Sequence, residues 1–84
     1  MKELKDLRKE IDKLDRELLK ILKKRLGLSR KIWEKKKDLN LKRIDPQREL
    51  EIVKKVVEKG VKHGLKQKFV KDLFLVILNH SKKH

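Results

Sequence analysis

The sequence lacks cysteine entirely, which excludes disulfide bonds and cysteine-ligated metal sites. No apolar run reaches the roughly 18 residues that a membrane-spanning helix requires. The first residues, MKELKDLRKEID, contain no apolar signal core. We therefore expect a cytoplasmic protein.

Aromatic residues make up only 4% of the chain, and there are three glycines and one proline. A sheet protein requires β-branched and aromatic strands with Gly- and Pro-rich turns, whereas this chain is rich in the helix formers Lys, Leu and Glu. We expect an all-α fold and a single domain over residues 1–84. A core of this size is marginal, so help from a partner chain is plausible.

Motifs for several kinds of chemistry are also missing. Ser29 and Ser81 have no identifiable His/Asp pairing, and no Gly-rich phosphate loop is present. The histidines His63, His80 and His84 form no metal-ligand pattern with a carboxylate pair. The sequence thus predicts neither acyl-transfer catalysis nor a metal site.

What the chain has in excess is positive charge, with a formal net charge of +14. That charge favours anionic partners: nucleic acid, a membrane surface or an acidic small molecule. Lys and Glu enrichment is also typical of proteins from hot-living organisms. Lysine is the bulk cation, so each arginine suggests a use for a planar fork that fits carboxylates. The arginines are Arg8, Arg16, Arg25, Arg30, Arg43 and Arg48.

An apolar heptad stripe predicts one helix from about residue 3 to about residue 37. Arg25 occupies the stripe position between Ile21 and Leu28. Such a helix is ~50 Å long, against ~30 Å for a compact domain of this size. Two shorter helices cannot cover it, so the geometry predicts a dimer. The stripe is Leu4, Leu7, Ile11, Leu14, Leu18, Ile21, Leu28 and Ile32.

Two shorter helices follow a turn marked by Asp38 and Asn40. Asp45 before Pro46 is a helix-start signal, and the second helix should end near His63 with Gly64 as a left-handed cap. The third helix carries a second apolar face that leads to Ser81. That face is Phe69, Val70, Leu73, Phe74, Ile77 and Leu78.

The candidate functional residues are mostly cationic. Taken singly, Arg8, Lys36, Arg48 and Glu49 are best interpreted as solvated surface charges. Arg25 is the exception, because a charge buried in a helix seam needs a counter-charge, although it could also be a register-setting residue.

Taken together, these residues belong to motifs of a known family. The stretch LRKEIDKLDRELLKILKKR, the later KK pair, the IDPQRE segment and GLKQKFVKDLFLVILNHS resemble the all-helical chorismate mutases. The resemblance runs nearly from end to end without gaps between motifs. It implies an intertwined homodimer whose two active sites are each built from both chains, with no cofactor. It also implies rearrangement of chorismate, a dicarboxylate, to prephenate on the shikimate route to Phe and Tyr.

The resemblance also implies individual roles. Arg8 of the partner chain would hold one substrate carboxylate and Arg25 the other, while Lys36 would face the ether oxygen whose bond breaks. Glu49 would bind the ring hydroxyl and Arg48 would orient the site.

Two further positions match substrate-binding positions of the family. Asp45 belongs to the motif that opens the second helix, and Ser81 matches a polar position contacting a carboxylate. The family usually has Gln or Glu four residues after that serine, which would be position 85.

Three alternatives remain. A lyase that removes pyruvate from isochorismate shares this fold and cation set, although the Asp45, Arg48 and Glu49 motif favours the mutase. A nucleic-acid-binding module would explain the +14 charge, but the sequence lacks interleaved aromatics and a recognition-helix motif. The third is a catalytically inactive scaffold dimer.

Overall fold

The computed structural model describes residues 2–83, so Met1 and His84 lie outside the described residues. It contains the helices α1 (Leu4–Asp38), α2 (Pro46–Lys62) and α3 (Gln67–Lys83), and no strand within residues 2–83. The predicted all-α class is confirmed. The predicted first helix agrees with α1 to within about one residue at each end.

The start and end of α2 follow the local signals in the sequence. The side chain of Asp45 accepts a hydrogen bond from the backbone N–H of Arg48 at 3.1 Å, and Pro46 is the first helical residue. His63 caps the C-terminal end, and Gly64 has a φ of +84°. The positive φ of Gly64 confirms the predicted left-handed cap. Glycine suits this position because a left-handed conformation is strained for residues with a side chain.

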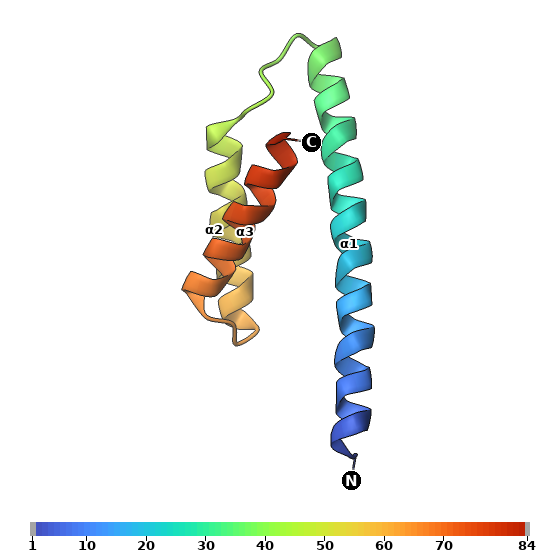
Figure 1. Cartoon of the computed structure of the whole chain (residues 1–84). Coiled ribbons are helices and arrows are strands. Elements are labelled where there is room, and N and C mark those ends of the chain that lie inside the picture. Colours follow the sequence, from blue (N-terminus) through green and yellow to red (C-terminus); the bar gives the residue numbers. More distant parts are fainter. Residues whose placement is uncertain (1, 84) are drawn as a thin grey trace.

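The helices α2 and α3 form an antiparallel hairpin that lies beside the C-terminal half of α1 (Figure 1). Gly60 and Val70 allow the two hairpin helices to approach closely: a Cβ atom on Gly60 would lie 2.7 Å from Val70 Cγ2. Val70 and Leu78 are the buried hydrophobic residues within residues 2–83. The hairpin therefore supplies what core this chain has.

The N-terminal end of α1 extends beyond the hairpin (Figure 1), and the molecule measures 57 × 24 × 16 Å. The radius of gyration is 16.3 Å, whereas a compact chain of this length would have about 12 Å. Every residue of the apolar stripe is exposed, from Leu4 at 62% to Ile32 at 57%. The hairpin does not cover that stripe. No helix within residues 2–83 is both long and apolar enough to cross a bilayer.

Candidate active site

A cavity of ≈ 400 Å³ lies where the C-terminal half of α1, the start of α2 and the end of α3 meet. That volume is within the range of small-molecule sites, about 300–1,000 Å³. Six of the seven site residues expected from the sequence line the cavity, and Arg8 does not. The six are Arg25, Lys36, Asp45, Arg48, Glu49 and Ser81.

The cavity wall is strongly cationic. Only two carboxylates, Asp45 and Glu49, stand among its lining residues. A concave surface with such an excess of positive charge attracts small anions and raises their local concentration. The cationic lining residues are Arg25, Arg30, Lys36, Arg43, Arg48 and Lys82.

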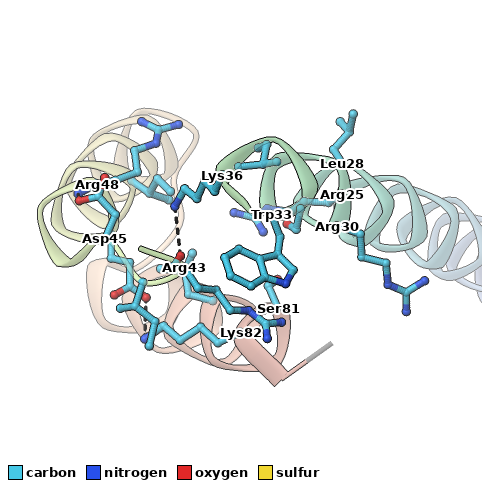
Figure 2. Close-up of a pocket in the computed structure, with 16 residues that line it drawn as sticks. Arg25, Leu28, Arg30, Trp33, Lys36, Arg43, Asp45, Arg48, Ser81 and Lys82 are labelled. Atoms are coloured by element: carbon cyan, nitrogen blue, oxygen red, sulfur yellow. Dashed lines mark hydrogen bonds and ion pairs between the residues drawn. The ribbon is translucent and has the colours of Figure 1, made fainter. Parts of the chain in front are cut away.

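Lys36 projects from the last turns of α1 toward the segment that leads into α2. Its Nζ donates a hydrogen bond to the backbone carbonyl of Arg43 at 3.1 Å (Figure 2). An ammonium group has three donors, so two remain for a ligand in the cavity. The bond to Arg43 therefore orients Lys36 without exhausting its donors.

Glu49, in the first turn of α2, forms an ion pair with Lys82 near the end of α3 at 2.6 Å. The Glu49 side chain is 26% exposed and that of Lys82 is 33% exposed. Lys82 occupies one oxygen, Oε1, and a carboxylate has a second oxygen that can accept another hydrogen bond. The pair joins the two helices of the hairpin at the cavity wall.

The other α2 and α3 positions are engaged locally. Arg48 Nη1 lies 3.5 Å from Glu51 Oε1, and Figure 2 shows the Arg48 guanidinium directed away from the cavity. The Asp45 carboxylate caps α2. Ser81 Oγ donates to the carbonyl of Ile77 at 2.9 Å, which leaves its oxygen able to accept.

Arg25, on the apolar stripe of α1, and Arg8, at the edge of that stripe, lie far apart within one chain. Arg25 is half-buried and lines the cavity, while Arg8 is exposed near the start of the helix. Seventeen residues separate them, which corresponds to about 25 Å along a helix axis. Arg8 therefore does not reach the cavity of its own chain.

Sequence reasoning gave no site role to Trp33, Arg43 or Lys82, all of which line the cavity. The Arg43 guanidinium lies 5.1 Å from the centroid of the Trp33 ring. Two of the three are distinctive in the sequence: Trp33 is the single tryptophan, and Arg43 is an arginine in a chain that otherwise prefers lysine, whereas nothing in the sequence distinguishes Lys82. Within residues 2–83, no group of three or more His, Asp or Glu side chains is placed to hold a metal ion.

Comparison with known proteins agrees with the motifs. The family model described as chorismate mutase type II matches residues 7–84. The chain belongs to this family. The expected resemblance is thus confirmed by a match that includes every cavity residue named above.

Two of the three relatives described next have chorismate mutase in their names. The chain is 27% identical over 82 residues to the chorismate mutase of Methanocaldococcus jannaschii, covering 98% of this chain and 83% of that protein. It is 47% identical over 57 residues to the bifunctional chorismate mutase/prephenate dehydratase of Aquifex aeolicus, covering 68% of this chain but 16% of the relative. It is 33% identical over 81 residues to the T-protein of Haemophilus influenzae, spanning 22% of it. No solved structure matches with statistical significance.

Proposed function

We propose that this chain converts chorismate to prephenate in the biosynthesis of Phe and Tyr. The observation that supports this most directly is the cationic cavity, in which six residues at family motif positions meet from three helices. The rearrangement is unimolecular and needs no nucleophile, metal or cofactor. It needs a flexible dianion held in a compact shape, with positive charge at the oxygen that becomes negative.

In this proposal Arg25 holds the substrate in shape and Lys36 stabilises the developing negative charge. Arg25 binds one carboxylate through its planar fork, which restricts the substrate toward the chair-like conformation that reacts. Lys36 donates to the ether oxygen as its bond to carbon breaks and negative charge develops. Fixed donors of this kind contribute roughly 3–4 kcal/mol to the transition state in other enzymes.

The remaining residues position the ring and its substituents. Glu49 accepts from the ring hydroxyl through the oxygen that Lys82 does not occupy. Ser81 contacts a carboxylate, and Asp45 holds the first turn of α2 at the cavity as its cap. Arg48 orients the site, which requires its side chain to leave Glu51 or to act through it.

The second carboxylate would be held by Arg8 of a second copy in a homodimer. An antiparallel pairing of two α1 helices brings Arg8 of one copy beside Arg25 of the other if the twofold axis passes near Arg16 or Glu17. The centre of the exposed apolar stripe is Leu18, close to that point. The pairing that covers the stripe is thus also the pairing that would complete the site.

The direct test follows chorismate loss and prephenate formation, and then repeats the assay with isochorismate. Arg25→Ala and Lys36→Ala should each lower kcat/KM by about 100-fold or more, as removal of a fixed charge-stabilising donor does elsewhere. Lys54→Ala, an exposed α2 change outside the cavity, is the charge-matched control. Unchanged turnover in both cavity variants would contradict the proposal, and release of pyruvate from isochorismate alone would favour the lyase.

A further inference from the structure

Arg43, in the segment between α1 and α2, is held at two points by one face of α1. Lys36 Nζ binds its backbone carbonyl at 3.1 Å, and the Trp33 indole lies under its guanidinium at 5.1 Å. Trp33 and Lys36 are three residues apart, so both project from the same side of the helix. The result is a loop arginine with a defined place at the cavity wall (Figure 2).

The cation–π contact with the indole ring uses no hydrogen-bond donor, so the N–H edge of the guanidinium remains available to a ligand. The edge carries five N–H donors in one plane, in a geometry that fits a carboxylate bidentately. The stacked arrangement also removes much of the rotational freedom that an exposed arginine would lose on binding. The neighbouring Lys42 has neither contact and does not line the cavity.

We propose that Arg43 is an additional residue that binds a substrate carboxylate, and that Trp33 is the positioning residue that holds it over the cavity. This inference rests on the proposed function, because it assigns part of the same dicarboxylate. It adds a third arginine, from the loop, to Arg25 and the partner's Arg8. The substrate would then be bound by Arg25 on α1, by the partner's Arg8 and by Arg43 in the segment between α1 and α2.

The kinetic test compares Arg43→Met with Lys42→Met, since each removes one positive charge from the same loop. Arg43→Met should raise KM for chorismate about tenfold with kcat changed less than about threefold, because a ground-state binding contact is lost. Lys42→Met should leave both within about twofold of wild type. Trp33→Leu should raise KM about threefold to fivefold. Trp33→Phe should raise KM much less, since its smaller aromatic ring still contacts the Arg43 guanidinium.

A second readout uses the fluorescence of Trp33, which is the single tryptophan of the chain. Titration of wild type with prephenate should change its emission, and Arg43→Met should lose most of that change while keeping wild-type helical content by circular dichroism. Should Arg43→Met unfold, Arg43→Lys replaces it: charge is kept, stacking is weakened, and KM should rise by an intermediate factor.

The outcomes separate this inference from the proposed function. If wild type converts chorismate but Arg43→Met and Lys42→Met have equal KM values, Arg43 is not a binding residue. A fall in kcat without a rise in KM also overturns the assignment. If wild type converts no chorismate, it is the proposed function that fails.

Discussion

Lys82 Nζ lies 2.6 Å from Glu49 Oε1, so the last turn of α3 is joined to the first turn of α2 at the cavity wall. Its side chains are less exposed than those of the pairs Lys2–Glu10, Lys37–Glu34, Arg48–Glu51, Lys55–Glu51 and Lys68–Asp72. The pair fixes the direction of a carboxylate that faces a cationic cavity. The proposed function gives this pair a positioning role, and its partial exposure limits its contribution to stability to about 1 kcal/mol.

Glu49→Gln should lower kcat/KM for chorismate at least tenfold, since a neutral amide is a weaker acceptor for the ring hydroxyl than a carboxylate. The free energy of unfolding should change by less than about 1 kcal/mol, as for other partly exposed pairs. Steady-state kinetics and urea unfolding measure the two effects. Glu58→Gln is the control on the same helix: it removes an exposed carboxylate outside the cavity and should leave kcat/KM nearly unchanged. Equal losses in both variants would show that Glu49 acts only through charge.

Acid should weaken the fold partly through Glu51. The hydrogen bond and charge of Lys55, and then the charge of Arg48, lower the pKa of Glu51 below its ordinary value of 4.5. A lowered folded-state pKa means that the carboxylate stabilises the fold above pH 4.5 and loses this contribution as the pH falls through the lowered value. Thermal unfolding of Glu51→Gln should therefore show a smaller drop in Tm between about pH 6 and about pH 3 than wild type. Identical drops would exclude this contribution.

Gly60→Ala should destabilise the hairpin by about 1–3 kcal/mol through overpacking, despite the better helix propensity of alanine. The added Cβ would lie 2.7 Å from Val70 Cγ2 and 3.3 Å from Val70 Cγ1. The penalty should shrink in a Val70→Ala background, where both methyl groups are absent. A double-mutant cycle from urea unfolding measures this coupling, and strict additivity would contradict the close approach of the two helices.

Asp45 has a capping role that can be separated from any contact with substrate. Asp45→Ala should cost about 1 kcal/mol of stability, because the backbone N–H of Arg48 loses its acceptor. Asp45→Asn keeps a capping oxygen and should cost only a few tenths of that. If kcat/KM follows stability across both variants, Asp45 only caps; a loss in Asp45→Asn at full stability assigns it a substrate contact.

The helix ends could be predicted because each depends on neighbours in the chain. Asp45 with Pro46 starts α2, Gly64 adopts the left-handed cap, and Asn40 turns the chain after α1 with a φ of +57°. The exposure of the apolar stripe also followed from helix length alone. These features depend on local backbone geometry and on the spacing of apolar residues along the helix, and not on tertiary contacts.

The cavity contacts could be predicted only in part. The family motifs indicated Lys36 and Glu49, but not that each has a tertiary partner within the chain. Lys82 meets Glu49 across 33 positions of sequence, and no local period encodes that pairing. The preference for arginine at position 43 was visible in the composition, yet its stacking on Trp33 depends on the path of the loop.

Complementation between two inactive variants tests the central claim of a chorismate mutase site shared between two chains. Arg8→Ala and Lys36→Ala should each be nearly inactive alone. When they are unfolded together and refolded at equal amounts, half of the dimers carry one variant of each kind, and one of their two sites has both wild-type residues. Activity should then return to about a quarter of the wild-type value, as statistical mixing in a twofold dimer requires. No recovery from a mixture that forms dimers would contradict the shared site, and full activity of Arg8→Ala alone would contradict the role of the partner's arginine.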